Sequence, residues 1–216
     1  KYGVPFEILM RVEMFQNQKL ARMLKDAGCF KVAFGVESGD EKQRIEALDR
    51  HMSDKKLINA FRVCRDVGIK TNSINIIGFP DETEEMIQKT VRLNRKLRPT
   101  SSGVNIFYPY KGTPLGDRCF HEGLVDLNKF ATFSAERRDS VLNFPEKHLD
   151  LLLKYQKLWP YLVHPIWSDT GFKLRLKDFL RHFGLLGMAM KIHRTMKVIL
   201  RTRNIPAGYI RPGRAA

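Results

Sequence analysis

The 216-residue sequence contains few cysteines. Cys29, Cys64 and Cys119 lie far apart, and no two of them have the spacing of a CxxC motif. An odd number of widely separated cysteines argues against a disulfide framework and against a cysteine-held metal centre in this stretch. We therefore expect reduced thiols, as in the cytoplasm.

Several common cofactor motifs are missing as well. The sequence has no GxGxxG and no HExxH, and the segment around Gly68–Thr71 lacks the first glycine of a phosphate-binding loop. The six histidines show no ligand spacing. These absences exclude the usual dinucleotide-binding, P-loop and zinc-protease sites, and we expect no metal ligands in this chain.

Long hydrophobic runs are also absent. The longest apolar stretch, Phe183–Met190, is too short to span a bilayer, and no secretory signal is present. Acidic residues are scarce in the last quarter, where Asp178 alone opposes eleven basic residues from Lys173 onward. This segment therefore carries +10 of the net charge of +15. The basic character belongs to the C-terminal segment and not to the fold as a whole.

The sequence of the basic segment is compatible with more than one binding partner. Apolar side chains alternate with the cations listed here: Lys191, Arg194, Lys197, Arg201 and Arg203. Such a helix fits an anionic membrane surface, RNA or plain solvent. No RNA-reading aromatic motif is present, so the sequence favours the membrane surface or a solvated face over RNA. We expect a cytoplasmic location, with peripheral membrane attachment as an alternative.

Strand and helix patterns alternate in the first half of the chain. Strands are predicted at 6–12, 31–37, 69–77 and 104–108, separated by helices at 17–28, 53–68 and 81–97 and a polar helical segment at 40–50. This alternation predicts an α/β fold with a parallel sheet. From about Asp126 the pattern becomes helical, with helices predicted at 130–143, 146–158, 173–183 and 185–200 and a poorly ordered end at 204–216.

Polar residues or glycines follow every predicted strand. They are Arg11 and Glu13, then Glu37-Ser38-Gly39, then Asn75 and Gly78, then Tyr108-Pro109-Tyr110 with Gly112. The carboxyl ends of parallel strands meet at one edge, where ligands bind in such folds. For Glu37-Ser38-Gly39 alone, a strand followed by a solvated turn is an equally good interpretation.

Four segments in order carry a resemblance to a known family. They are Phe34-Gly35-Val36-Glu37-Ser38-Gly39, Leu48-Asp49-Arg50, Asn75 to Thr83, and Phe107 to Leu115. Together they resemble the second half of a radical S-adenosylmethionine (SAM) core of the Elp3/MiaB/NifB-like branch, and the tail resembles the cobalamin-binding-domain group. The resemblance implies the C-terminal part of a partial (β/α)6 TIM-type barrel in residues 1–125, followed by an α-helical C-terminal region in residues 126–216.

The resemblance also implies roles for individual residues. Glu37, Ser38 and Gly39 would lie beside the ribose and methionine of SAM, and Arg50 would pair with the methionine carboxylate. Asn75 would bond the ribose, while Ile77, Gly78, Phe107 and Tyr108 would surround the adenine. Arg11 or Glu13 would line the substrate side. Ordinary alternatives stand beside each role: a solvated helix end for Arg50, a turn residue for Asn75 and a core residue for Phe107.

The family's CxxxCxxC loop, which holds a [4Fe–4S] cluster, is not in this sequence. We therefore expect an N-terminally truncated radical SAM enzyme, with the cluster cysteines upstream and this chain alone inactive. The complete protein would generate a 5′-deoxyadenosyl radical for hydrogen abstraction from an unknown organic substrate or for cobalamin-dependent methyl transfer. The alternatives are a non-catalytic SAM-binding module and a basic-tail module that binds membrane or RNA.

Overall fold

The computed structural model describes residues 3–132, 137–165 and 168–182. The chain divides into a larger unit, residues 1–171, and a smaller one, residues 172–216. The predicted helix at 185–200, its basic residues and the chain end at 204–216 lie outside the described residues.

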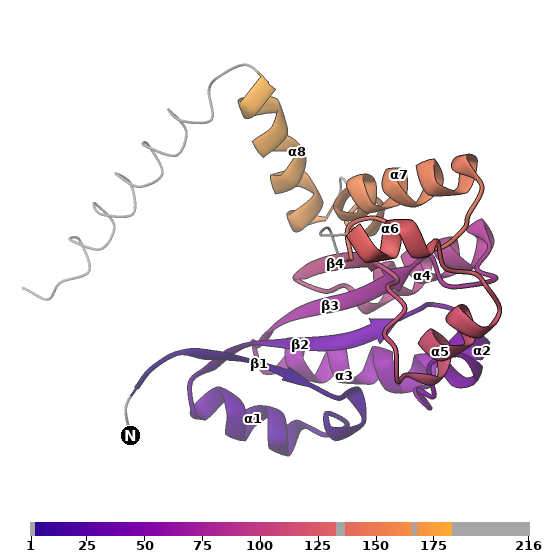
Figure 1. The fold of residues 1–216 in the computed structure, drawn as a ribbon. Helices are drawn as coiled ribbons and strands as arrows, with labels where there is room; N and C mark the ends of the chain where they lie inside the picture. The colour runs from indigo at the N-terminus through magenta and orange to yellow at the C-terminus, as the bar shows by residue number, and fades with distance from the viewer. Residues whose placement is uncertain (1–2, 133–136, 166–167, 183–216) are drawn as a thin grey trace, which may run out of the picture. The chain divides into compact units, whose positions relative to one another are not determined.

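The larger unit is built on one parallel sheet. Its strands are β1 (Phe6–Met10), β2 (Cys29–Glu37), β3 (Lys70–Ile77) and β4 (Ser101–Ile106), and they are hydrogen-bonded in that order. The main crossover helices are α1 (Gln18–Asp26), α3 (Asp54–Asp66) and α4 (Glu84–Leu97). The predicted α/β alternation and parallel sheet are confirmed (Figure 1).

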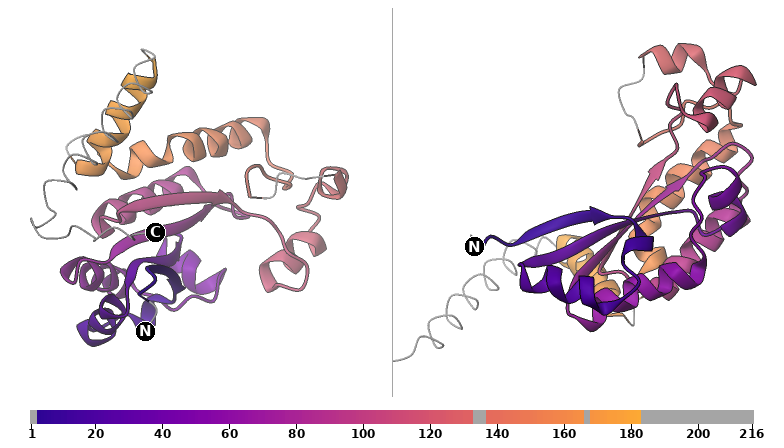
Figure 2. Two further views of the ribbon diagram at one scale, coloured as in Figure 1. Left: turned by 90° about the vertical axis from the view of Figure 1, so that its left-hand side faces the viewer. Right: turned by 90° about the horizontal axis from the view of Figure 1, so that it is seen from below.

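Helices cover one face of this sheet (Figure 2). Val32 and Phe34 of β2 point to that face and pack with Phe61 of α3, whose ring lies 5.1 Å from that of Phe34. Alternate residues of the same strands point the other way, because side chains alternate along a strand. On β1 this leaves Leu9 70% exposed, so the uncovered face is available to line a site.

Helix caps account for most of the helix starts. The side chains of Asn17, Ser53 and Thr83 each accept a backbone N–H at the N-terminus of α1, α3 or α4. With Thr83 as its cap, α4 begins after the predicted start at residue 81, and the Asp81 carboxylate pairs with Arg118 at 2.8 Å. The first strand–helix connection contains a short 3-10 helix, η1 (Val12–Met14).

After β4 the structure differs from the predicted helices. The segment contains α5 (Pro114–His121) and α6 (Leu127–Thr132), while residues 137–145 are not helical. The predicted helix at 130–143 is therefore wrong, since Leu142 forms an antiparallel bridge with Val125. The apolar spacing of residues 141, 142 and 144 reflects burial of a loop.

The long helix α7 (Glu146–Val163) continues through Pro160, where the sequence predicts a stop. Trp159 is buried, and its Nε1 donates to Ser102 Oγ on β4 at 2.9 Å. Val163 is buried one turn further on. Packing on the sheet therefore maintains the helix past the missing proline N–H.

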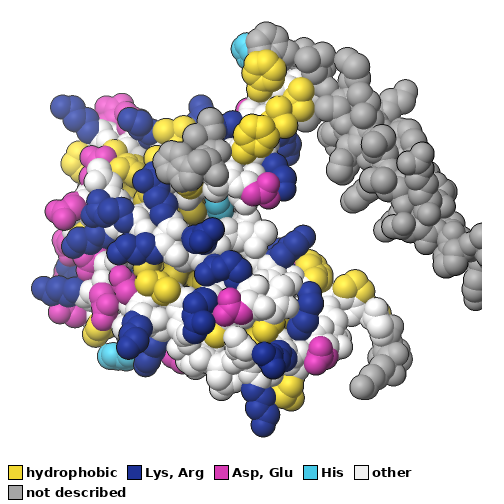
Figure 3. All heavy atoms as spheres, turned by 180° about the vertical axis from the view of Figure 1, so that it is seen from behind, with side chains coloured by type: hydrophobic (Ala, Val, Ile, Leu, Met, Phe, Trp, Pro, Cys, Tyr) yellow, Lys and Arg dark blue, Asp and Glu magenta, His cyan; other side chains and the backbone are white. Residues whose placement is uncertain are grey.

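The described residues of the smaller unit, 172–182, belong to α8 (Asp169–His182), which begins four residues before the predicted start. Phe172, Leu176 and Phe179 are 57%, 43% and 57% exposed and recur at helical spacing. In the described part of the chain, no helix combines the length and the hydropathy needed to cross a membrane. Acidic and basic side chains are interspersed over the face of the molecule in Figure 3.

Candidate functional site

Glu37 ends β2 at the carboxyl edge of the sheet. Its backbone is left-handed (φ 63°), which turns the side chain back over Gly35. A Cβ on residue 35 would meet Glu37 Oε1, so glycine at this position makes room for the carboxylate. Only 15% of the Glu37 side chain is exposed, and burial raises its pKa, an effect that Arg50 opposes.

Arg50 faces this carboxylate across a small cavity. Its Nη2 lies 4.0 Å from Glu37 Oε1, and 39% of the side chain is exposed. The cavity measures about 240 Å³ and includes Arg11 and Met52 in its lining. The structure thus brings together three of the predicted residues, Glu37, Arg50 and Arg11, from three separate segments of the chain.

Glu13, the other predicted substrate-side residue, lies in η1 and its Oε1 is 3.5 Å from Arg11 Nη2. Its second oxygen, Oε2, is buried and has no hydrogen-bond partner among the described residues. Arg11 is 65% exposed. Arg11 therefore stands at the rim of the small cavity, and Glu13 lies beside it without lining the cavity.

Ser38 and Gly39 turn away from the cavity. Ser38 is fully buried and its Oγ donates to Gln43 Oε1 at 2.6 Å. The backbone N–H of Gly39 donates to Thr90 Oγ1 at 2.7 Å, and a Cβ at this glycine would lie 2.3 Å from the backbone of Thr90. Both residues hold the turn after β2 against α4.

Arg44 is a residue that sequence reasoning missed. It lies in α2 (Glu41–Glu46) and is fully buried. Its guanidinium donates to the Ser38 carbonyl at 2.7 Å, to the Met52 carbonyl at 3.1 Å and to Asp54 at 2.5 Å. It thereby ties the turn after β2 to the end of the loop that carries Arg50 and to the start of α3. The only signal in the sequence is a basic residue in a short polar helix, which usually lies in solvent.

Asn75 and Ile77 occupy the helix-covered face of β3, which differs from the expected contact with ribose and adenine. Asn75 is fully buried; its Nδ2 donates to the Gly103 carbonyl at 2.9 Å and its Oδ1 accepts from Asn94 of α4 at 2.7 Å. Ile77 packs in a core cluster with Trp159. The residues of β3 that face the other side are Ile74 and Ile76.

Gly78 begins the loop after β3. Its φ of +81° suits glycine, and a Cβ would lie 2.9 Å from Leu152 of α7. Its backbone N–H donates to the Glu82 carboxyl group, which is only 4% exposed. Burial raises the pKa of Glu82 to about 8, although the backbone N–H groups of Gly78 and Phe79 oppose the rise. A carboxyl group that keeps its proton thus supports this loop.

Phe107 and Tyr108 follow β4 and line a larger inner cavity of about 640 Å³. The Phe107 ring lies 5.2 Å from that of Phe79, and Tyr108 stacks on Phe130 at 5.5 Å. The sheet contributes Leu9, Ile74 and Ile76 to the same wall. Glu37 lines both cavities, so the uncovered face of the sheet and its carboxyl edge form one continuous site.

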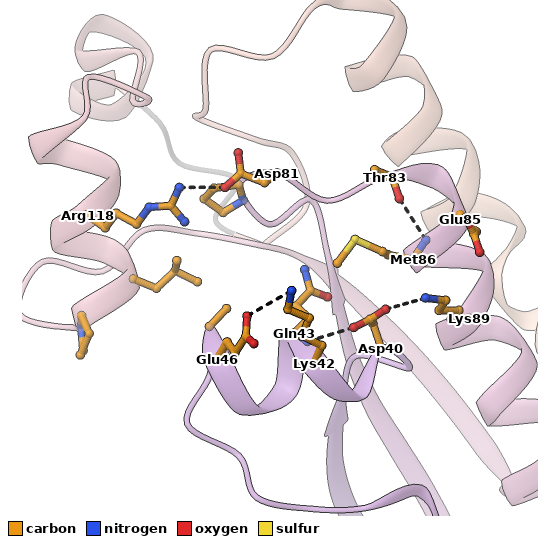
Figure 4. Close-up of a pocket in the computed structure, with 14 residues that line it drawn as sticks. Asp40, Lys42, Gln43, Glu46, Asp81, Thr83, Glu85, Met86, Lys89 and Arg118 are labelled. Atoms are coloured by element: carbon orange, nitrogen blue, oxygen red, sulfur yellow. Dashed lines mark hydrogen bonds and ion pairs between the residues drawn. The ribbon is translucent and has the colours of Figure 1, made fainter.

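A third cavity of about 600 Å³ lies between α2, α4 and α5 (Figure 4). Its cations are matched by carboxylates: Lys89 with Asp40 at 2.8 Å, Arg118 with Asp81 at 2.8 Å, and Lys42 with Glu46 at 3.9 Å. All three cations of this cavity, here called the outer cavity, are thus paired, and we assign it no ligand.

The three cysteines are buried and form no disulfide; Cys29 and Cys64 lie in one core cluster and Cys119 lies in another. Burial raises the pKa of Cys64 to about 12 and that of Cys119 to about 11, and it raises the pKa of Cys29 as well. No group of three or more His, Cys, Asp or Glu in the described ranges could hold a metal ion. The described residues therefore do not fit an iron–sulfur cluster.

Comparison with known proteins identifies the architecture. The model of the radical SAM superfamily matches residues 3–93, which run from the approach to β1 into α4. Residues 3–93 therefore carry the match to the radical SAM superfamily. The matched residues include Glu37 and Arg50 and end before Phe107 and Tyr108.

Two curated relatives of this chain carry enzyme names. An uncharacterised methyltransferase of Pyrococcus horikoshii is 28% identical over 194 residues, which are 88% of this chain and 39% of that protein. The anaerobic magnesium-protoporphyrin IX monomethyl ester cyclase of Cereibacter sphaeroides is 22% identical over 84% of this chain and 30% of its own length. The chain thus spans between 30% and 39% of the length of these relatives.

A solved structure shows the same fold. The coproporphyrinogen III oxidase of Escherichia coli, a radical SAM enzyme, superimposes with a TM-score of 0.51 at 16% identity. The similarity covers 73% of this chain and 32% of that one. This agrees with the expected partial barrel of the α/β class.

Proposed function

We propose that this chain forms the SAM-binding part of a radical SAM enzyme. The observation that carries the proposal is the pairing of Glu37 and Arg50 across a cavity at the carboxyl edge of the sheet. A carboxylate suits the ammonium and ribose hydroxyls of SAM, and a guanidinium suits its carboxylate. The facing charges of the two side chains at one cavity support this assignment.

The other proposed residues act around this pair. Phe107 and Tyr108 offer rings to the adenine. In this proposal Ser38, Gly39, Asn75, Ile77 and Gly78 contribute by placing the strand ends and their backbone groups. Arg11 and Glu13, at the rim, face the substrate.

When SAM is bound and reduced through a [4Fe–4S] cluster, it supplies a 5′-deoxyadenosyl radical for hydrogen abstraction, or a methyl group where cobalamin takes part. The names of the two relatives, a methyltransferase and a cyclase, support an enzyme of this kind. Cobalamin itself is proposed on the resemblance of the helical tail. The residues described here bind and orient SAM and enclose the site, and the cluster ligands belong elsewhere.

The test is SAM binding by equilibrium dialysis with the protein at its full natural length. Losing one charge-assisted contact is worth about 1.5–3 kcal/mol, so Arg50→Gln and Glu37→Gln should each weaken binding about 10- to 100-fold. Gly35→Ala should also weaken it, because the new methyl group displaces the Glu37 carboxylate. Arg118→Gln in the outer cavity is the control and should bind as the wild type does. Unchanged affinity in both charge variants would refute the proposal.

The alternative function for the same site is a module that binds SAM but does not catalyse a reaction. The iron content of the full-length protein, purified without oxygen, separates the two. About four irons per chain supports the enzyme, because one [4Fe–4S] cluster holds four. SAM binding by an iron-free protein would favour the module.

A second function is proposed for α8, which we infer binds an anionic membrane surface. Its exposed Phe172, Leu176 and Phe179 form one stripe, and four cations, Lys173, Arg175, Lys177 and Arg181, share the helix with Asp169 and Asp178. Aromatic and basic residues on one helix are typical of interfacial binding. Salt-sensitive pelleting with phosphatidylserine vesicles, lost in Phe172→Ser/Phe179→Ser, is the expected result. Binding to transfer RNA with no binding to vesicles would contradict it.

A further inference from the structure

The inner cavity has opposite charges at its two ends. Glu37, Glu46 and Asp49 line it near the ends of β2 and α2. Beyond the apolar wall, Arg137 lines it near the end of β4, and it is the one cation among the described residues that line this cavity. SAM at Glu37 would place its own cationic groups at the acidic end, so the basic end is left for a different molecule.

Arg137 is held in place through its main chain. Its carbonyl oxygen accepts the backbone N–H of Ile106 at 2.9 Å and Nε2 of Gln156 at 3.1 Å. These bonds tie residue 137 to the end of β4 and to α7. The backbone conformation is left-handed (φ 68°), so these contacts select a conformation that arginine rarely adopts.

The guanidinium of Arg137 is bonded to a phenol. Nε and Nη2 donate to Tyr110 Oη at 3.2 and 3.0 Å, and the guanidinium carbon lies 5.9 Å from the centre of the ring. A phenolic oxygen that accepts from arginine still has its own O–H to donate. Arg137 and Tyr110 therefore present adjacent donors, which suit the two oxygens of a carboxylate or a similar oxyanion.

The wall next to this donor pair is aromatic and aliphatic. The Tyr110 ring lies 5.1 Å from Tyr108, which stacks on Phe130. Ile74 and Ile76 of the sheet complete the surface. Flat rings pack well against such a wall, whereas a strongly hydrated sugar or peptide would lose water without compensation.

We propose that the inner cavity binds an apolar, ring-bearing substrate that carries an oxyanion. Arg137 and Tyr110 donate hydrogen bonds to this oxyanion. The ring system lies against Tyr108 and the two isoleucines, and the oxyanion lies at the basic end, away from Glu37. This rests on the proposed function only in taking the molecule to be the substrate of the SAM-dependent reaction. The donor pair and the apolar wall are independent of it.

Two fluorescent probes that differ by one anion test the assignment on the full-length protein. 8-Anilino-1-naphthalenesulfonate carries a sulfonate, and N-phenyl-1-naphthylamine has the same rings without it. Arg137→Gln should weaken binding of the anionic probe about tenfold, which corresponds to the loss of one charged hydrogen bond. Binding of the neutral probe should not change. Tyr110→Phe should weaken the anionic probe by a smaller factor. Arg118→Gln, at the outer cavity, is the matched control and should change neither.

The assignment is overturned if Arg137→Gln leaves the anionic probe unchanged or weakens both probes equally. SAM affinity, measured on the same variants, keeps the two proposals apart, because Arg137→Gln should bind SAM as the wild type does. If the wild type does not bind SAM but shows the probe pattern, the proposed function fails and the oxyanion site stands. Circular dichroism of each variant confirms that it is folded.

Discussion

At the scale of the residue, Glu82 links protonation to stability. In the unfolded chain its carboxyl group ionises near its ordinary pKa of 4.5, whereas in the fold it retains its proton up to about pH 8. The contribution of Glu82 to the free energy of unfolding is therefore complete below pH 4.5 and is lost as the pH rises toward 8.

We expect the free energy of unfolding to fall by about 1.4 kcal/mol per pH unit across this window through Glu82 alone. Glu82→Gln cannot ionise and should flatten this part of the profile. Urea denaturation between pH 5 and pH 8 (about the interval between the two pKa values) measures both proteins. An identical slope in wild type and variant would show that Glu82 is ionised in the fold.

Arg44 provides the second prediction at this scale. Arg44→Met leaves the buried carbonyls of Ser38 and Met52 without donors, so we expect a loss of about 2–4 kcal/mol in the free energy of unfolding. The control is Arg62→Met on α3, whose ion pair with Asp66 is on the surface. It should cost less than about 1 kcal/mol. Equal losses in urea denaturation would mean that the buried bonds of Arg44 contribute nothing particular.

At the scale of the element, the turn after β2 depends on contact with α4. Gly39→Ala would place a methyl group 2.3 Å from the backbone of Thr90, so either the turn or the helix must move. We expect a loss of at least about 2 kcal/mol in stability, as for overpacked cores. Gly103→Ala on β4 meets no atom within 4 Å and should be neutral or slightly stabilising. Thermal denaturation of both variants measures this difference. A Gly39→Ala protein as stable as the wild type would contradict the proposal that Gly39 is required for packing against α4.

Elements were predictable where one period dominates a segment. The spacing of Leu57, Phe61 and Cys64 identified α3, and all three residues are buried in the structure. The residues after β4 have no such single period, because short helices alternate with a buried loop. There the sequence pattern missed α5 and extended a helix over residues 137–143.

At the scale of the whole molecule, the separation of the cysteines makes a prediction about iron. Reconstitution of these 216 residues with iron and sulfide under anoxic conditions should give well under about one iron per chain, because a [4Fe–4S] cluster needs thiolates grouped in space. Burial also keeps the pKa of Cys64 and Cys119 far above neutral. Iron assay and the absorbance of the cluster give the readout. About four irons per chain, abolished by Cys119→Ser, would contradict it.

The sequence by itself predicted the succession of strands along the chain and the parallel sheet, and it proposed a site at the strand ends. These follow from local patterns: apolar runs, capping residues and the polar residues that come after each run. Glu37 was proposed in this way because it follows a predicted strand, whereas Arg50 was proposed only from the resemblance of Leu48-Asp49-Arg50 to a family motif.

Only the tertiary structure decided which way the side chains point. A strand alternates its faces every residue, so Asn75 and Ile76 are neighbours in sequence and serve opposite sides of the sheet. The helices α4 and α7 cover the face of the sheet that carries Asn75, and the opposite face, which carries Ile76, lines the inner cavity. The contact between Arg137 and Tyr110 also depends on the tertiary structure. It joins residues 27 positions apart, and no local sequence pattern extends over that separation.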